Sequence, residues 1–229
     1  LNTLPQAQGW TYVGPGVTPT VGGGVTNLNT TATNNFLAGF TRADQTLDAA
    51  GGFTISFTAR INSENHTGSN KDNDGVEDRA GFSLVVVSDD PSKAIEIDFW
   101  SDRIWAQADG TNQNDPSVEP DDAGATGFET LFTQAEGVSF DTTSLVNYDL
   151  TIQGSTYTLY ADGNVVRTGK SRAYPAATGA IQPYETPNLI AFSDNTPSAR
   201  ANVDLASVAI TTTESVLTNG AYTEDGPAT

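Results

Sequence analysis

The sequence predicts an all-β protein whose strands form two packed sheets or a barrel. Short runs in which apolar and polar residues alternate recur along the chain, and Gly, Asn, Asp and Pro separate them. No segment combines a sustained 3.6-residue apolar spacing with helix caps. The clearest run is 53–61, where every second residue is apolar, so that one strand face is buried and the other is wet.

The expected strands follow one another with no internal repeat and no linker. They are residues 24–30, 35–41, 53–61, 81–88, 94–100, 103–108, 128–136, 148–153, 156–161, 165–168, 189–193 and 203–211. So many short strands in 229 residues predict one sandwich domain over residues 1–212. The polar residues 213–229 are expected to form a tail or a peripheral strand.

Composition excludes several functions. The 28 acidic residues outnumber the 10 basic ones, and the net charge of −18 argues against binding to nucleic acid or anionic membranes. No apolar run reaches the ~20 residues of a membrane-spanning helix. There is no cysteine, and any Ser-His-Asp triad would have to use the single histidine, His66. The acidic, Thr- and Asn-rich composition, without a basic and apolar leader, is typical of an extracellular protein, secreted or on the cell surface, whose signal has been removed.

The segment 148–166, YDLTIQGSTYTLYADGNVV, predicts paired strands and a tight hairpin in which Asp162-Gly163 supplies the positive φ angles. It resembles the paired strands of concanavalin A-like and laminin-G-like jelly rolls. GWTYV at 9–13, FTISFTARI at 53–61 and the closing strands LIAFSDN and ANVDLASVAI fit this superfamily as it occurs in secreted bacterial proteins, cyanobacterial ones included. The resemblance implies a two-sheet antiparallel jelly-roll sandwich. The superfamily holds lectins, adhesion modules, glycoside hydrolases and polysaccharide lyases, so the fold alone selects no function.

One polar loop has the spacing of a calcium site. Oxygen-bearing side chains alternate before Gly75 and another carboxylate follows, at Asn70, Asp72, Asp74 and Asp78. Ca²⁺ prefers six to eight oxygen ligands, and a glycine permits the sharp turn. The run resembles the DxDxDGxxD loops of dockerin and thrombospondin type 3 repeats, with Asn in the first position. The alternative is a solvated acidic loop in an acidic protein.

The segment 94–108, AIEIDFWSDRIWAQA, is the candidate binding face. A two-residue turn at Ser101-Asp102 would pair Phe99 with Ile104 on a buried face. The opposite face would then carry Glu96, Asp98, Trp100, Arg103, Trp105 and Gln107, and the following strand is expected to add Gln134 and Glu136. Indoles beside carboxylates and amides are typical of a sugar-binding platform. The alternative is that loops cover this face and the tryptophans are structural core.

A third loop, 169–188, carries Arg172, Tyr174, Tyr184 and Glu185, which either line a groove rim or pack as ordinary loop residues. The order Glu96-Ile97-Asp98 also superficially resembles the ExDxE signature of family 16 glycoside hydrolases. In that family the last Glu is the general acid, but here Trp100 and Ser101 occupy the two positions open to it.

These observations lead to one expected function and two alternatives. The expected function is a secreted, Ca²⁺-stabilised carbohydrate-binding or cell-surface adhesion module, whose partner is a glycan or polysaccharide. The first alternative is a structural subunit of an extracellular layer or filament, whose partners are copies of itself. The second is a glycan hydrolase or polysaccharide lyase on the same fold.

Overall fold

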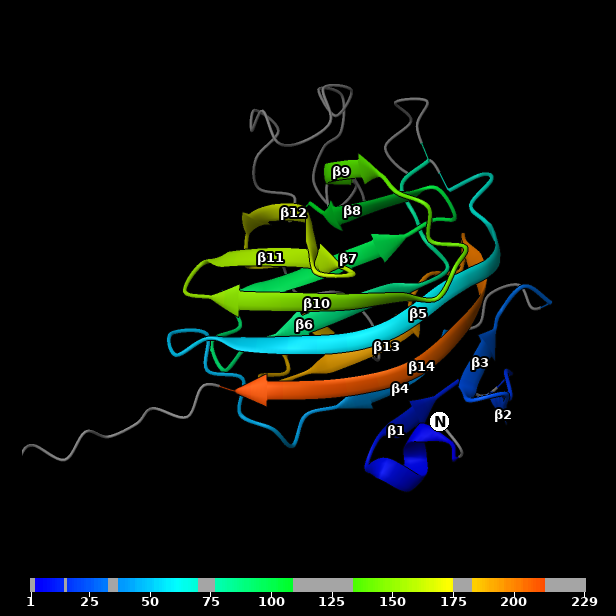
Figure 1. Cartoon of the computed structure of the whole chain (residues 1–229), viewed down its shortest axis with the longest axis horizontal. Coiled ribbons are helices and arrows are strands. Elements are labelled where there is room, and N and C mark those ends of the chain that lie inside the picture. The colour runs from blue at the N-terminus through cyan, green and yellow to red at the C-terminus, as the bar shows by residue number, and fades with distance from the viewer. Residues whose placement is uncertain are drawn as a thin grey trace, which may run out of the picture.

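A computed structural model describes residues 3–14, 16–32, 37–69, 77–108, 134–174 and 183–212, which form a sandwich of two antiparallel sheets of seven strands each (Figure 1). Sheet A has the order β1 (Thr11–Val13), β4 (Ala38–Arg42), β13 (Ile190–Asp194), β6 (Ser83–Val87), β7 (Ala94–Phe99), β8 (Arg103–Gln107) and β9 (Gln134–Ser139). Sheet B has the order β12 (Asn164–Lys170), β11 (Thr156–Ala161), β10 (Val146–Gln153), β5 (Phe53–Asn65), β14 (Arg200–Thr212), β3 (Val25–Asn29) and β2 (Thr20–Gly22). The predicted all-β, two-sheet antiparallel jelly-roll sandwich is confirmed.

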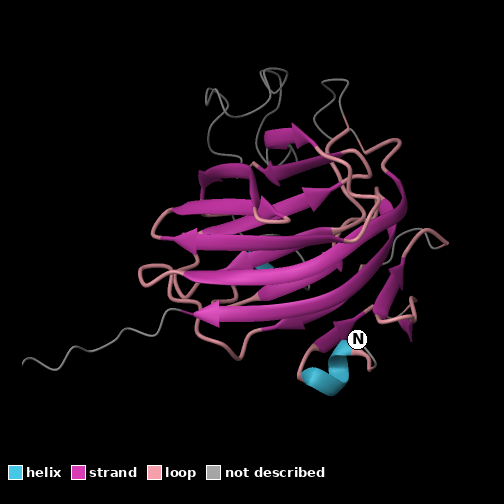
Figure 2. Cartoon of the chain, viewed as in Figure 1, coloured by secondary structure: helices cyan, strands magenta, loops and turns pink. Residues whose placement is uncertain are grey.

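Helical structure is limited to short 3-10 turns in the described part of the chain (Figure 2). They are η1 (Pro5–Gln8) near the N-terminus and η4 (Pro183–Glu185) just before β13. Among the described residues, no helix has the length and apolar character needed to span a membrane.

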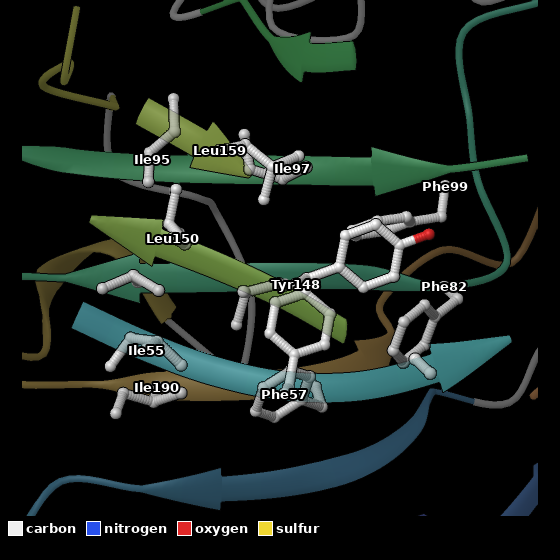
Figure 3. Packing of buried hydrophobic residues seen from close by; sticks show 14 of the residues in the cluster. Ile55, Phe57, Phe82, Ile95, Ile97, Phe99, Tyr148, Leu150, Leu159 and Ile190 are labelled. Carbon is white, nitrogen blue, oxygen red and sulfur yellow. The ribbon is translucent and has the colours of Figure 1, made fainter. Parts of the chain in front are cut away.

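The main hydrophobic core lies between the two sheets and is rich in aromatic rings (Figure 3). Phe57 of β5 stacks on Tyr148 of β10 with ring centroids 5.0 Å apart, and Phe99 of β7 meets both rings edge-on from the other sheet. Ile55 and Leu150 are fully buried beside them. Each such large apolar side chain stabilises the fold by about 1.5–3 kcal/mol relative to exposure, so this layer holds the sheets together.

Both predicted hairpins form, and the first has the expected register. In the first, Ile97 pairs with Ala106, Asp98 with Trp105 and Phe99 with Ile104. The turn closes with a hydrogen bond of 2.9 Å from the Trp100 N–H to the carbonyl of Arg103. In the second, Asp162 and Gly163 have φ angles of 47° and 77°, the positive values that a two-residue hairpin of the mirror-image turn type requires.

Several strand boundaries differ from those that the sequence predicts. β1 and β2 were not expected as strands, because three residues each are too few to show an alternation. β5 and β14 are both 13 residues long, since their polar ends still pair with each other where the apolar alternation has stopped. The expected strand 128–136 is described only from Gln134, where β9 begins, and residues 128–133 and 213–229 lie outside the described residues.

A buried polar cluster ties the edge of sheet A to sheet B. The Arg172 guanidinium lies 2.7 Å from Glu136 Oε1, and the hydroxyl of Tyr157 in β11 donates to Glu136 Oε2. Glu136 has a φ of 50°, and the pairing of β8 with β9 shifts register between Ile104 and Ala106. This irregularity turns the Glu136 carboxylate toward sheet B, away from the face on which the sequence predicts it. Burial of the ring, and then the Glu136 carboxylate, raise the pKa of Tyr157, so the phenol stays a hydrogen-bond donor.

We expect Glu136→Ala to lower the free energy of unfolding by about 3 kcal/mol, because it leaves the Arg172 cation buried without its counter-charge. Urea denaturation monitored by fluorescence measures the change. Asp44→Ala is the matched control, since it breaks the exposed Arg42–Asp44 pair and should change stability little. Equal effects of the two substitutions would contradict the assignment of a buried structural pair.

Candidate functional site

The face of sheet A that points away from sheet B, here called the outer face, carries the predicted site residues. The strand registers place its side chains in two rows. One row runs Val13, Gly39, Ser193, Ser83, Asp98 and Trp105, and the other runs Thr11, Thr41, Ala191, Val85 and Glu96. From β4 to β8 the outer face therefore changes from small side chains to carboxyl groups and then to an indole.

Glu96 is fully buried, and both of its carboxylate oxygens accept hydrogen bonds. Tyr184 of η4 donates its hydroxyl to Oε2, and Asn195 donates its Nδ2 to Oε1 at 2.6 Å. Tyr174 stacks on Tyr184 with ring centroids 4.5 Å apart, accepts the Glu96 backbone N–H and donates to the Gln107 carbonyl. The third loop therefore contributes two tyrosines that hold Glu96 in place.

Asp98 lies beside Glu96 on the same face and is only 3% exposed. Its Oδ2 has no hydrogen-bond partner in the described part of the chain. Burial, and then the neighbouring Glu96 carboxylate, raise the pKa of Asp98 well above its ordinary value, while Arg79 opposes them. Arg79 donates its Nη1 to Gln107 Oε1 at 3.1 Å, and burial lowers its pKa against the pull of the same acids. The arrangement favours a proton on Asp98.

The two tryptophans do not form an open platform. Trp105 is 1% exposed and Trp100 is 8% exposed, with their rings edge to face at 4.5 Å. The Trp100 indole N–H donates to the Arg79 carbonyl at 2.9 Å, and His66 stacks on the Trp100 ring at 3.9 Å. The sequence leaves open whether these tryptophans form an exposed binding platform or are covered as structural core. The structure shows that they are covered. The alternation shows which side chains share a face, but it does not show whether other segments cover that face.

The remaining predicted residues are held by hydrogen bonds within the protein. Arg103 donates its Nε to Gln134 Oε1 at 2.6 Å, and Gln134 donates its Nε2 to the Glu77 carbonyl at 2.9 Å. Gln107 joins Arg79 to Tyr184, its Nε2 lying 3.3 Å from the tyrosine hydroxyl. Seven of the eight predicted binding residues therefore come together on or beside the outer face, and Glu136 is the exception.

Of the predicted calcium ligands, Asn70, Asp72 and Asp74 lie outside the described residues. Asp78 is described and buried, next to Arg79 in the chain. Within the described ranges, no group of three or more acidic or histidine side chains is arranged to hold a metal ion.

A hollow of about 360 Å³ opens on the outer face beside Glu96, and the sequence analysis did not predict it. Its floor consists of small outward-facing residues of β4, β13 and β6, namely Gly39, Thr41, Ala191, Ser193 and Val85. Its walls are Val13 and Leu37 on one side and Pro183, Thr186 and Leu189 on the other, and Asp194 and Asn195 close one end. A Cβ at Gly39 would lie 2.3 Å from Ser193 Cβ, so the two strands approach closely here only because residue 39 is glycine. In the sequence, the small residues at alternate positions of β4 and β13 were the signal from which this hollow could have been predicted.

Asp194 is another buried acid beside the hollow, and by the alternation of β13 its side chain points away from the outer face, toward Thr30 and Arg200. Thr196 donates its backbone N–H to Oδ1 at 3.2 Å, whereas Oδ2 has no hydrogen-bond partner among the described residues. Burial raises the pKa of Asp194 to about 7, against the lowering effect of its hydrogen bonds and of Arg200. Asp194 therefore gains its negative charge as the pH rises through neutrality.

We expect Asp194→Asn to remove a pH dependence of stability. Because the pKa of Asp194 is about 7 in the folded chain and 3.8 ordinarily, the folded state binds the proton more tightly than the unfolded state. The contribution of Asp194 is fully present below pH ~4 and is lost up to pH ~7, at about 1.4 kcal/mol per pH unit at most. Urea denaturation from pH 4 to 8 should show wild type losing stability relative to the variant. A constant difference between the two proteins would refute the shift.

Comparison with known proteins places the fold. No protein family and no curated protein sequence matches this chain. Among solved structures, the carbohydrate esterase vb_24B_21 of Shiga toxin-encoding bacteriophage phi24B has a TM-score of 0.53 at 13% identity, covering 90% of this chain and 91% of that one. The protein of unknown function SO2946 from Shewanella oneidensis MR-1 has a TM-score of 0.51 at 8% identity, covering 93% and 80%. The exoplasmic/lumenal domain of VIP36 in its Ca²⁺/Man-bound form reaches 0.49 at 12%, covering 89% and 82%. The two structures with TM-scores above 0.5, together with the two-sheet topology, confirm as the fold the concanavalin A-like jelly roll that the sequence resembles.

Proposed function

We propose that this protein is a carbohydrate-binding module and that the hollow on the outer face of sheet A holds a sugar unit. The observation that carries the proposal is the hollow itself, at about 360 Å³ with an apolar lining and a polar end. Small-molecule sites are concave, of about 300–1,000 Å³, and lined by apolar groups with a few placed polar ones. A sugar unit suits such a site because it presents both C–H surfaces and hydroxyl groups.

The polar groups in the hollow match hydroxyl recognition. Thr41 and Ser193 offer hydroxyls from the floor, Thr186 lies in one wall and Asn195 offers an amide at one end. Asn195 is held by its hydrogen bond to Glu96, which Tyr184 holds from the other side. A group fixed before binding loses less conformational entropy when the ligand arrives, and this strengthens affinity.

The fold gives general support, because the similar phage protein is a carbohydrate esterase. The acidic surface, with a net charge of −18, favours neutral glycans over uronic acids or other anions. We place the module outside the cell, secreted or on a surface where glycan binding would serve adhesion, on the basis of its composition.

Filling the hollow should abolish glycan binding. We expect Ala191→Leu to reduce binding on a glycan array at least about tenfold, because the larger side chain occupies the floor where the ligand would lie. Thr41→Leu tests the same floor at a less buried position. Thr151→Leu, on the outward-facing side of sheet B, is the control and should bind like wild type. Folding of each variant is checked by its melting temperature. Undiminished binding by a folded Ala191→Leu protein would place the site elsewhere.

We also propose that Asn70, Asp72, Asp74 and Asp78 bind Ca²⁺, on the support of their alternate spacing before Gly75. Millimolar Ca²⁺ should raise the melting temperature and EDTA should reverse the rise, because a ligand that binds only the folded state stabilises it. The double variant Asp72→Asn and Asp74→Asn should lose the response, and Mg²⁺ at the same concentration is the ionic control. A melting temperature that does not respond to Ca²⁺ would reject the site.

A further inference from the structure

The walls of the hollow are apolar apart from Thr186, and they lack aromatic rings in the described part of the chain. Val13 and Leu37 face Pro183 and Leu189 across it, and no aromatic side chain lines it within the described residues. A bare pyranose ring binds most often by laying its C–H face on an aromatic ring, and this lining offers none. The lining instead suits a small apolar substituent such as a methyl group, whose burial is favourable in proportion to its area.

Asn195 fixes the polarity of the end of the hollow. Its Nδ2 faces Glu96 Oε1, because a carboxylate can only accept and the amide must present its donor. Asn195 is partly exposed and lines the hollow, so its Oδ1 is an acceptor for a ligand that reaches this end. A ligand group that donates a hydrogen bond therefore suits this end of the hollow.

We infer that the hollow recognises the acetamido group of a neutral 2-acetamido sugar, and this inference rests on the proposed carbohydrate-binding function. One acetamido group supplies an N–H for Asn195 Oδ1 and a methyl group for the apolar walls. Its carbonyl can accept from a floor hydroxyl, Thr41 or Ser193. A hydroxyl at the same carbon has a donor but no methyl, and a 6-deoxy sugar has a methyl but no amide donor. A carboxylated sugar would bring a negative charge toward Glu96.

Matched sugars test the inference on the wild-type protein. Isothermal titration compares N-acetylglucosamine with glucose and N-acetylgalactosamine with galactose, and fucose and glucuronate are the methyl-only and anionic probes. We expect each acetamido sugar to bind about tenfold more tightly than its hydroxyl partner, from one buried methyl group and one added hydrogen bond. Saturation-transfer NMR should show the strongest transfer to the acetyl methyl protons.

The outcomes separate this inference from the proposed function. Equal affinity within each pair, with glycan binding still blocked by Ala191→Leu, would overturn the acetamido assignment and leave the binding module standing. Absence of binding to any glycan would overturn the proposed function itself. Strong saturation transfer to ring protons with none to the acetyl methyl would also overturn the assignment.

Asn195→Ala tests the amide directly. The affinity for the acetamido sugar should fall severalfold, because the acceptor for its N–H is gone while the apolar walls remain. Asn147→Ala is the control, since Asn147 lies on sheet B and bonds Asp162 at the surface. If Asn195→Ala is folded by its melting profile and keeps the full affinity for the acetamido sugar, Asn195 does not bind the acetamido group. If it does not fold, the wild-type sugar pairs and the NMR measurement still decide.

Discussion

The removal of two neighbouring carboxyl groups from water is the constraint on which the outer face depends. Glu96 and Asp98 lie two residues apart on β7, and a buried charge without compensation is strongly unfavourable. The chain meets this constraint in two ways. Glu96 accepts hydrogen bonds from Tyr184 and Asn195. The pKa of Asp98 is raised by burial and by the Glu96 carboxylate, which favours its neutral, protonated form. The segment before β13, which carries Tyr184, and the segment after it, which carries Asn195, must therefore both lie against sheet A.

The same contacts shape the hollow. Tyr184 can reach Glu96 only if η4 lies over β6, and this places Pro183, next to it in the chain, in the wall of the hollow. Asn195 reaches Glu96 from the other side and closes the end. Beyond the acids the face is filled by Trp105, while before them it carries only small side chains. The empty volume therefore lies where the strands carry Gly39 and Ala191, and its borders are set by groups that serve Glu96.

Patterns within short stretches of sequence were enough to predict much of the fold. They could not predict which side chains of the outer face are buried, because the segments that bury them come from other parts of the chain. The register of the β7–β8 hairpin followed from alternation and from a turn of two residues, both properties of adjacent sequence. Trp105 is covered by Trp100 and by Ala80, which comes from an earlier segment of the chain, and the alternation within residues 94–108 does not encode that contact. Glu136 was misplaced for a different reason, because a single irregular residue reverses the face to which a side chain points.

The buried acids influence ligand binding indirectly, because Glu96 holds in place a side chain that lines the hollow. Both oxygens of Glu96 are engaged, and Asp98 is almost completely covered, so the group that a sugar in the hollow would meet is Asn195. If the amide of Asn195 turned over, its oxygen would face Glu96 Oε1 and that buried oxygen would lose its donor, which is costly. The Glu96–Asn195 hydrogen bond therefore fixes the position of the amide oxygen. A sugar substituent that places a donor against this oxygen gains a hydrogen bond, whereas one that places an acceptor there meets another acceptor.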